Sequence, residues 1–469
     1  MICVVLCGGA GSRLWPLSRQ EHPKPFITLP GGKNLLQTAY LHASKLSKCQ
    51  EIVTVTNKEL YFKAAEAMRS LDLPVPASFI LEPAARNTAP AIAAAAAAAL
   101  SSSGPGALVL VLAADHLISN QRAFEAAVNE ASSLAGQGFL ATFGLKPTRP
   151  ETGFGYIEAE GSRVLSFVEK PDLETAKRYL ASGSFYWNAG LCCFKTGALI
   201  EIFKKVAPEI YAKAEESFQS AKKPSKFANV TELNPDIFAS IPSISFDYAV
   251  LEKTDKVAMV PCDLGWSDIG TWSALSELYP EDESGNHLFN QKTAILSGAS
   301  DCDVYSEDRL VACLGLANTL IVDTADAVLV ADKSKVQDVR LLYDEMKSRN
   351  SETFKRHRTV YKPWGSFTLL GEGPRFKIKR LVIKPGGSLS LQMHRHRSEH
   401  WVVVSGSAEV VCGDEVFFVD TNESTYIKAG HFHRVSNKGL IDLIIIEVQS
   451  GDYLEEDDII RSDDAYGRA

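Results

Sequence analysis

The sequence predicts an α/β domain with a mostly parallel, mixed sheet, then a small β module, and finally a C-terminal β-barrel. Three observations lead to this prediction. Short apolar strands alternate with helical stretches in the first part of the chain, the middle part changes to short β segments with turns, and the last part is rich in strands and glycine turns with almost no helix. We therefore place the domains at residues 1–280, 281–350 and 351–469.

The first domain alternates strands and helices in the manner of a layered α/β fold. Its predicted strands are Ile2–Leu6, Ile52–Thr56, Leu108–Ala113, Leu140–Phe143 and Val164–Glu169. Its predicted helices are Leu36–Lys45, Lys58–Leu71, Ala123–Ala135 and the alanine run Ala93–Ala99. This run follows Asn87 and Pro90, a capping residue and an early-turn proline, so it is interpreted as a well-capped, tightly packed helix.

The middle and last regions are interpreted as two separate β structures. The middle β segments are Cys302–Tyr305, Leu310–Leu314, Thr319–Val322 and Ala327–Ala331, followed by a connecting helix at Lys335–Arg349. The charged stretch Lys347–Arg358 then leads into the last region, whose dense strands indicate a sandwich or barrel.

Bulk composition excludes several classes of protein. A chain of 469 residues is longer than one hydrophobic core usually serves, and its 45% hydrophobic and 23% charged residues are ordinary for a globular protein. The net charge of −8 argues against a nucleic-acid partner. We see no signal-peptide pattern and no apolar segment of membrane-spanning length. The nine cysteines show no Cys-x-x-Cys spacing, so we expect reduced thiols in a cytoplasmic protein that binds no membrane.

The segment that follows the first strand has the features of a polyphosphate site. Backbone amides can approach a ligand closely at three glycines, Gly8, Gly9 and Gly11. Arg13 and Lys24 add two cations at short offsets from these glycines. The segment matches neither a P-loop, because no Gly-Lys-Ser/Thr follows, nor a dinucleotide fingerprint, because Leu14 stands where the third glycine should be.

Two carboxylates from distant segments are candidate Mg²⁺ ligands. Asp115 follows the apolar strand at Leu108–Ala113, and strand ends are where open α/β sheets bind ligands. Asp268 lies in a rigid aromatic turn, Gly265–Trp272. Mg²⁺ that bridges phosphates favours such oxygen ligands. A helix cap at Asp115 and a turn-forming aspartate at Asp268 are the plainer alternatives.

Further polar residues at turns are candidate contacts for a sugar, a base or a phosphate. The candidates for the sugar phosphate are Gly153, Glu169, Lys170 and Asn188. Those for the nucleotide are Glu82, Asn87 and Thr88, at the start of the alanine-rich helix. Ordinary turn chemistry and helix capping account for each of them individually.

The C-terminal region concentrates side chains that can bind a metal. Gln392, His394 and His396 would lie on one face of a strand because side chains alternate there. A second group contains His431 and His433. Histidines gathered in two short windows favour a metal centre or an active site over scattered surface histidines.

The motifs of the first domain, taken in order, resemble the mannose-1-phosphate guanylyltransferases. The resemblance rests on the glycine-rich start through Pro25, Glu82–Pro90, Ala114–His116, Phe167–Pro171, Trp187–Gly190 and Gly265–Trp272. It implies a Rossmann-like nucleotidyltransferase domain in which mannose 1-phosphate attacks the α-phosphorus of GTP and diphosphate leaves.

The resemblance also implies roles for the candidate residues of the first domain. Gly8, Gly9, Gly11, Arg13 and Lys24 would hold the nucleotide phosphates. Asp115 and Asp268 would hold Mg²⁺, while Glu169, Lys170 and Asn188 would hold the sugar phosphate. Positioning and charge neutralisation would supply most of the catalysis. The preference for guanine is implied by the resemblance alone, because no donor–acceptor pattern in these residues indicates which base is bound.

The C-terminal region resembles the cupins, and specifically the phosphomannose isomerase half of bifunctional enzymes. The first cupin motif fits Gly386, Gln392, His394, Glu399 and Gly406, whereas a register that starts from His394 and His396 fails at the acid. The second motif falls on Gly430, His433 and Asn437, with Lys428 where the family usually has proline.

This second resemblance implies a ligand set and a reaction. The implied ligands are Gln392, His394, Glu399 and His433, with His400 and His431 in reserve and His396 as a neighbour on the same face. The metal would be Zn²⁺ or another divalent ion (Mn²⁺, Fe²⁺ or Co²⁺) that polarises a carbonyl. Mannose 6-phosphate and fructose 6-phosphate would interconvert there, with Arg434 stabilising the enediolate or anchoring the phosphate.

The sequence therefore favours a bifunctional enzyme that makes a nucleotide sugar and isomerises a hexose phosphate. Two alternatives remain open: a guanylyltransferase whose cupin domain does not catalyse, and a non-enzymatic regulator that binds sugar nucleotides. The cations and carboxylates of the first domain argue against the regulator. An assembly of identical chains is compatible with every feature above.

Overall fold

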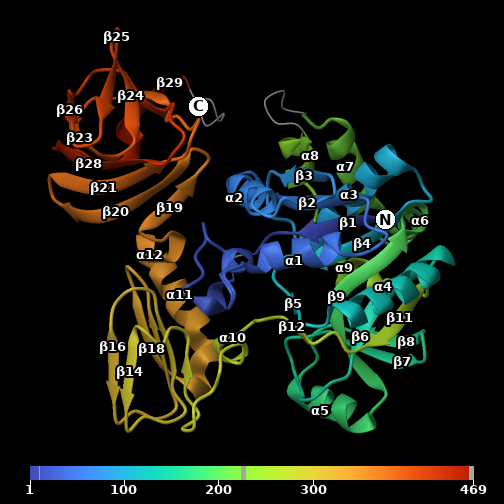
Figure 1. The fold of residues 1–469 in the computed structure, drawn as a ribbon. Helices are drawn as coiled ribbons and strands as arrows, with labels where there is room; N and C mark the ends of the chain where they lie inside the picture. The colour runs from blue at the N-terminus through green and yellow to red at the C-terminus, as the bar shows by residue number, and fades with distance from the viewer. Residues whose placement is uncertain (10, 223–228, 464–469) are drawn as a thin grey trace. The chain divides into compact units, whose positions relative to one another are not determined.

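The computed structural model describes residues 1–9, 11–222 and 229–463 (Figure 1). The chain forms two compact units, one of Met1–Thr324 with Val328–Phe354, the other of Ala325–Ala327 with the chain from Lys355 onward. Each unit encloses hydrophobic cores of its own.

The larger unit is built on a ten-stranded sheet of order β10-β3-β2-β1-β4-β9-β6-β11-β8-β7. Its strands are β1 Ile2–Leu6, β2 Glu51–Asn57, β3 Ala77–Glu82, β4 Leu108–Ala113, β6 Leu140–Leu145, β7 Tyr156–Glu160, β8 Arg163–Val168, β9 Phe185–Lys195, β10 Val230–Glu232 and β11 Val257–Cys262. A separate two-stranded antiparallel sheet pairs β5 Leu117–Ile118 with β12 Trp266–Ser267. β1 runs parallel to both β2 and β4, whereas β9 is antiparallel to β4 and β6. The predicted mostly parallel, mixed sheet is confirmed.

Helices pack on both faces of this sheet. They are α1 Leu35–Ser44, α2 Lys58–Arg69, α3 Thr88–Ser103, α4 Gln121–Gly136, α5 Leu173–Ser182, α6 Thr196–Val206, α7 Pro208–Gln219, α8 Pro235–Ala239, α9 Phe246–Ala249 and α10 Trp272–Ser276. Cys3 and Val5 of β1 join the core with α1, α2 and α4, whereas Ile2 and Val4 join the core with α3, α6 and α7. A strand buried on both faces explains the uninterrupted apolar run at the start of the sequence.

The alanine run forms the centre of α3, as the sequence predicts. Asn87 caps the helix by accepting a hydrogen bond from the Thr88 amide, and Gly104 follows its last turn. Most of its alanines are buried against α6, α7 and α9. Small side chains therefore let several helices approach one face of the sheet closely.

The middle region forms a stacked β structure in which the pairs β13–β15, β15–β17 and β14–β16 are parallel without intervening helices. Its strands are β13 His287–Leu288, β14 Ala294–Ser297, β15 Asp303–Ser306, β16 Val311–Leu314, β17 Thr319–Asp323 and β18 Val328–Asp332. The predicted connecting helix begins as the 3-10 segment Lys333–Asp338 and becomes α11 only at Val339–Ser348, followed by α12 Glu352–Lys355.

The C-terminal region consists of two facing sheets of order β19-β20-β21-β28-β23-β26 and β25-β24-β27-β22-β29. The strands are β19 Thr359–Lys362, β20 Gly365–Gly373, β21 Phe376–Ile383, β22 Leu391–His394, β23 Arg397–Ser405, β24 Ser407–Cys412, β25 Glu415–Asp420, β26 Ser424–Ile427, β27 His433–Asn437, β28 Leu443–Gly451 and β29 Ile459–Asp463. Trp364, Ile383 and Val435 belong to the core that the two sheets enclose. The predicted β-barrel is confirmed.

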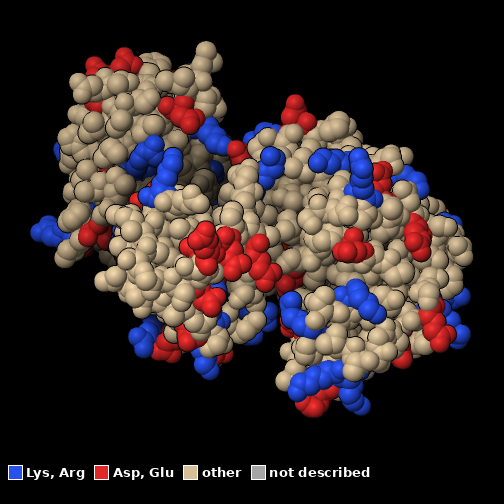
Figure 2. Space-filling view, turned by 60° about the horizontal axis from the view of Figure 1, so that its bottom comes forward, with Lys and Arg blue, Asp and Glu red and all other residues tan. Residues whose placement is uncertain are grey.

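Charged side chains of both signs lie on the face shown in Figure 2. Lys and Arg form small separate groups, as do Asp and Glu, and no broad basic surface covers this face. Among the described residues, no helix is both long enough and apolar enough to cross a membrane.

Candidate active sites

The glycine-rich segment of the larger unit leaves β1 at the point where β1 separates β2 from β4. Gly8 and Gly9 are exposed, and Gly9 has a φ of +91°. Gly11 has a φ of +59°, and a Cβ there would lie 2.7 Å from the Cβ of Lys24. Glycine is therefore required at Gly11 both by the backbone conformation and by the approach of Lys24.

Lys24 connects two of the predicted acidic segments. Its buried ammonium lies 2.9 Å from Oδ2 of Asp115 and also donates a hydrogen bond to the backbone carbonyl of Asp268. Burial alone would raise the pKa of Asp115, but Lys24 and His116 hold it below its usual value. The carboxylate of Asp268 accepts the amide of Gly270. Lys24, Asp115 and the Asp268 turn thus meet where β4 ends.

The other predicted nucleotide contacts differ in exposure and in whether their polar atoms already have hydrogen-bond partners. Arg13 is exposed on the 3-10 segment Ser12–Leu14. Asn87 is engaged in capping α3, and the Thr88 hydroxyl accepts the amide of Phe246. Glu82 ends β3, where burial raises its pKa to about 8. Its buried Oε1 makes no hydrogen bond with the described part of the chain. Glu82 is therefore the one of these groups with an unused acceptor.

The predicted sugar-phosphate residues gather in a second group. Lys170, whose φ is +48°, pairs with Glu169 at 2.8 Å. A Cβ at Gly155 would lie 2.5 Å from Oε2 of Glu169 and 3.5 Å from Cβ of Asn188, so this glycine lets the two residues meet. The amide of Gly153 donates to the side chain of Glu151, which lies outside this group.

Asp247, at the start of α9, completes this group and is missed by the sequence analysis. Asn188 donates from its side-chain nitrogen to Asp247 at 3.0 Å and accepts the Thr142 hydroxyl at 2.9 Å. Burial, and then the charge of Glu169, raise the pKa of Asp247 from 3.8 to about 6. Asp247 is far from any strand end in the sequence, and the Ser245 cap of α9 is the only local signal of its position.

The two groups are joined through His116. Its Nδ1 accepts the indole N–H of Trp266 at 3.3 Å, and a Cβ at Gly190 would lie 3.1 Å from its Cε1. The Gly190 amide in turn donates to Asn188. The cation-and-carboxylate centre and the Glu169–Asn188 group therefore belong to one continuous site.

Asp247→Asn is expected to raise the stability of the larger unit above pH 6. Because the folded-state pKa of Asp247 is raised, stability is present in full below pH 3.8 and is lost as the pH rises through about 6. The amide variant avoids that loss, so its thermal midpoint should exceed that of the parent at pH 8 and equal it at pH 4; each 1 kcal/mol gained shifts Tm by about 2–4 °C. Asp236→Asn, at an exposed position of α8, is the matched control. Equal midpoints at pH 8 would contradict this account.

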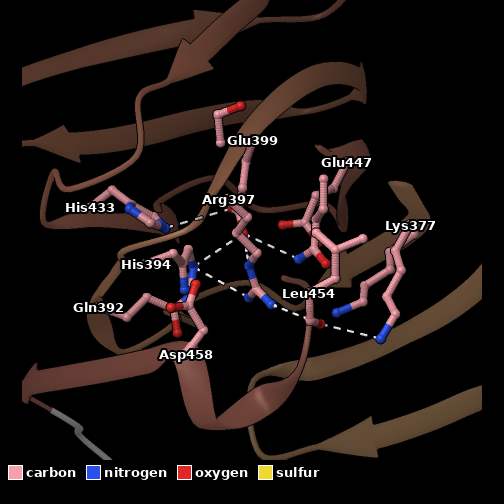
Figure 3. Close-up of polar contacts among 12 residues, drawn as sticks. Lys377, Gln392, His394, Arg397, Glu399, His433, Glu447, Leu454 and Asp458 are labelled. Carbon is pink, nitrogen blue, oxygen red and sulfur yellow. Dashed lines mark hydrogen bonds and ion pairs between the residues drawn. The ribbon is translucent and has the colours of Figure 1, made fainter. Parts of the chain in front are cut away.

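The C-terminal barrel contains a compact group of potential metal ligands. His394, Glu399 and His433 are buried and offer ligand atoms that lie within 4.8 Å of one another (Figure 3). Nε2 of His394 lies 3.1 Å from Glu399 and Nε2 of His433 lies 3.6 Å from it. These side chains come from β22, β23 and β27, where alternate residues face the interior. Gln392, two residues before His394, pairs in register with His433.

The protonation of this group suits a cation. Burial would raise the pKa of Glu399, but His394, His433 and Arg397 hold it well below its usual value. The pKa of His433 is lowered, first by burial. Its Nδ1–H donates to the carbonyl of His431, and its buried Nε2 makes no hydrogen bond within the described ranges. An ionised carboxylate beside a neutral imidazole with a free lone pair is a suitable donor set for a divalent metal.

Four further residues surround the ligands and are missed by the sequence analysis. Arg397 lies 3.4 Å from both His394 and Glu399. The indole of Trp401 donates to Glu399 and Glu447, and the Gln449 amide does the same. Burial, together with the charge of Glu399, raises the pKa of Glu447 to about 8. Alternation along β28 places Leu443, Ile445, Glu447 and Gln449 on one buried face, a signal that would have revealed the last two.

One prediction about the neighbouring residues needs correction. His396 was expected on the same strand face as Gln392 and His394, but β22 ends at His394; His396 lies in the bend that follows, its side chain is 60% exposed and it bonds Asp458. Arg434 follows His433 within β27, so the two side chains project from opposite faces of the strand. The catalytic role of Arg434 stays a prediction. The reserves His400 and His431 are exposed.

The fold and these two groups of side chains define a class: a nucleotidyltransferase-type α/β unit joined through a β-helix to a cupin barrel with metal-ligand geometry. Family models match the chain in the same order. Nucleotidyl transferase matches residues 2–285, MannoseP isomerase/GMP-like beta-helix domain matches 293–346, and Mannose-6-phosphate isomerase C-terminal matches 349–464.

Similar proteins agree with the family models. Xanthan biosynthesis protein XanB of Xanthomonas campestris is 46% identical over 472 residues, covering 99% of this chain and 98% of that protein. Mannose-1-phosphate guanylyltransferase of Escherichia coli is 43% identical, with 99% and 98% covered. The chain belongs to the nucleotidyl transferase family, and its resemblance to the bifunctional mannose-1-phosphate guanylyltransferase/mannose-6-phosphate isomerases is confirmed.

Two solved structures show the same architecture. One, described as a mannose-1-phosphate geranyltransferase from Thermus thermophilus, has a TM-score of 0.65 and 30% identity, covering 74% of this chain and 99% of that one. The other, a mannose-6-phosphate isomerase from Helicobacter pylori, has a TM-score of 0.51 and 33% identity, covering 57% and 99%.

Proposed function

We propose that the larger unit transfers a guanylyl group from GTP to mannose 1-phosphate. A phosphate oxygen of the sugar forms a bond to the α-phosphorus of GTP, and the bond from that phosphorus to the bridging oxygen breaks, which releases diphosphate. The observation that carries this proposal is the meeting of Lys24, Asp115 and the Asp268 turn beside the glycine-rich segment. The names of the full-length relatives supply the sugar and the base.

The nucleotide side of the site combines amides and cations. We assign the phosphates to the amides of Gly8, Gly9 and Gly11 and to the cations Arg13 and Lys24. Lys24 is held rigidly by its two oxygen partners, so it can neutralise charge that develops on the transferred phosphoryl group without reorganising. Glu82, Asn87 and Thr88 are assigned to the nucleoside, where the unused acceptor of Glu82 would meet a donor on the base or ribose.

Two carboxylates fit a magnesium ion in this site. Asp115 and Asp268 provide oxygen atoms, the donor type that Mg²⁺ prefers, from segments that Lys24 already brings together. When bound, Mg²⁺ would neutralise the nucleotide phosphates. Asp115 remains ionised for this task because Lys24 keeps its pKa low.

The sugar phosphate is assigned to the group around Asn188. Lys170 offers a half-exposed cation for the phosphate, and Glu169 and Asn188 offer an acceptor and an amide for the hydroxyls. Gly153 stays a predicted contact through its backbone. These contacts would orient the phosphate oxygen for in-line attack.

Incubation of the full chain with mannose 1-phosphate, Mg²⁺ and each nucleoside triphosphate in turn tests the proposal. Chromatography should detect GDP-mannose and diphosphate in equal amounts with GTP, and much less nucleotide sugar with ATP, UTP or CTP. Absence of a nucleotide sugar with all four triphosphates would reject the proposal and favour the regulator that binds sugar nucleotides.

We infer a second activity in the barrel, the interconversion of mannose 6-phosphate and fructose 6-phosphate. The observation that favours it is the buried group of His394, Glu399 and His433, joined by Gln392. A divalent metal, Zn²⁺ or alternatively Co²⁺, Mn²⁺ or Fe²⁺, would polarise the sugar carbonyl when bound there. Arg397, 3.4 Å from Glu399, and Glu447, whose pKa burial raises to about 8, are the candidate proton-bearing groups beside that position.

Removal of divalent metal is expected to affect the two activities differently. Dialysis of the full chain against a chelator should abolish isomerisation, because it removes the divalent metal that His394, Glu399 and His433 would hold. Zn²⁺ or Co²⁺ should restore it, while guanylyl transfer needs only added Mg²⁺. Lack of isomerase activity with any metal would favour the alternative in which the barrel does not catalyse.

The division of labour follows the three-part organisation expected from the sequence. We assign transfer to residues 1–280, a connecting role to 281–350 and isomerisation to 351–469. A cytoplasmic location stays a prediction from composition and cysteine usage.

A further inference from the structure

The inner face of the six-stranded barrel sheet changes from apolar to charged along its strands. Register aligns Leu381 with Ile445 and Val403 in one row, Lys379 with Glu447 and Trp401 in the next, and Lys377 with Gln449 and Glu399 in the third. The first row belongs to the core. The other two rows therefore form a polar mouth at one end of the barrel.

Four cations converge on this mouth. They are Lys377, Lys379, Arg397 and Arg461, and we call them the cationic mouth. The side chain of Lys379 is 12% exposed and that of Arg397 is 2% exposed. Arg461 comes from the opposite sheet, where it aligns with Gln392. The buried Nε atoms of Arg397 and Arg461 make no hydrogen bond with the residues that the structure describes.

The segment Leu454–Asp458, which we call the acidic strap, lies against these cations (Figure 3). The Leu454 carbonyl accepts Lys377 at 3.2 Å and Arg397 at 3.5 Å. Glu456 lies 3.9 Å from Lys379 and 4.0 Å from Arg461, and Glu455 lies 3.4 Å from Lys377. The strap therefore places the carboxylates of Glu455 and Glu456 against Lys377, Lys379 and Arg461, while Arg397 also pairs with Glu399 of the barrel.

We propose that the cationic mouth is the binding site for the phosphate group of a hexose phosphate, and that the carboxylate of Glu456 occupies this site until a phosphate monoester displaces the strap. This inference rests on the proposed isomerase function, since it assigns the phosphate subsite beside the same ligand group. Arg397 links the two parts, because it contacts His394, Glu399 and Leu454.

The strengths of the contacts favour displacement. The ion pairs of Glu456 are long, its side chain is 58% exposed, and such pairs contribute little to stability. The cations nevertheless act on it: although burial opposes the change, Lys379, Arg397 and Arg461 lower the pKa of Glu456. A phosphate monoester carries more charge and three acceptor oxygens, and it forms charge-assisted hydrogen bonds with Lys and Arg. The exchange of one carboxylate for one phosphate is therefore favourable.

Calorimetric titration of the full chain with mannose 6-phosphate, inorganic phosphate and mannose tests the inference. Lys379→Met should weaken binding of both phosphate compounds at least 10-fold, and Glu456→Gln should tighten it about threefold or more. Binding of mannose should not change. Lys438→Met and Glu409→Gln, which remove an ion pair of 3.5 Å elsewhere on the barrel, are the matched controls.

Each outcome decides the inference. Equal affinities in the parent and in Lys379→Met would overturn the phosphate site, and unchanged or weaker binding in Glu456→Gln would overturn the displaced strap. The larger unit is identical in all of these variants, so any phosphate that it binds contributes the same heat to each titration and does not affect the comparison. Because Glu456 is exposed, Glu456→Gln should fold, and its affinity for phosphate tests the inference even if Lys379→Met does not fold. The expected binding pattern without isomerisation would support the inference while rejecting the isomerase function.

Discussion

Lys24→Ala is expected to lower the rate of guanylyl transfer by about 10²–10³-fold and to leave isomerisation unchanged. The loss of one positioned charge at a centre of developing negative charge has this typical size. Lys24 also holds Asp115 and the Asp268 turn, so the variant loses both a phosphate contact and the alignment of two carboxylates. The measurement is kcat and KM for both substrates by product chromatography, beside an isomerase assay on the same preparation.

Two comparisons make this prediction specific. Lys33→Ala removes an exposed lysine from the neighbouring turn and should leave both activities intact. The thermal midpoint of Lys24→Ala shows whether the larger unit remains folded. Transfer at the parental rate in a folded Lys24→Ala protein would exclude this residue from catalysis, and loss of both activities would show that the two sites are not independent.

His394→Ala is expected to abolish isomerisation, with a loss of at least about 100-fold, and to spare guanylyl transfer. Removal of a group that only orients a metal ligand lowers metal affinity or activity about 10–100-fold. Removal of a ligand itself should lower them at least as much. The buried carboxylate of Glu399 would also lose its closest partner in the cluster. Metal content by mass spectrometry, measured after dialysis without chelator, should fall together with the activity.

His400→Ala is the matched control, because His400 lies between the buried residues Glu399 and Trp401 in β23 and is itself exposed on the opposite face of the strand. It should retain metal and activity. A folded His394→Ala protein with full metal content would show that the metal lies elsewhere.

Much of the larger unit follows from local sequence patterns. β4 has the bounds that its apolar run predicts, and α3 extends the alanine run in both directions to a cap and a glycine. The group of Glu169, Lys170 and Asn188 also forms, because Tyr156 of β7 pairs with both Val168, which precedes Glu169, and Trp187, which precedes Asn188. Asp247 could not be found this way, because only the packing of α9 against α3 brings it to Asn188.

In the barrel, the resemblance to the cupin motifs led to His394, Glu399 and His433, whose potential ligand atoms lie within 4.8 Å of one another. Alternation along a strand placed His396 on the same face as His394, which is wrong because β22 ends two residues earlier. Glu447 and Lys379 become neighbours only through the pairing of β21 with β28, a long-range register that no single segment contains.

The division of the barrel interior into an apolar row and two polar rows has an evolutionary consequence. The residues that secure folding, such as Leu381, Ile445 and Val403, are separate from those that would perform chemistry. Substitutions in the two polar rows therefore leave the contacts of the apolar row in place, so the chemistry of the barrel interior can change while the same apolar side chains hold the two sheets together.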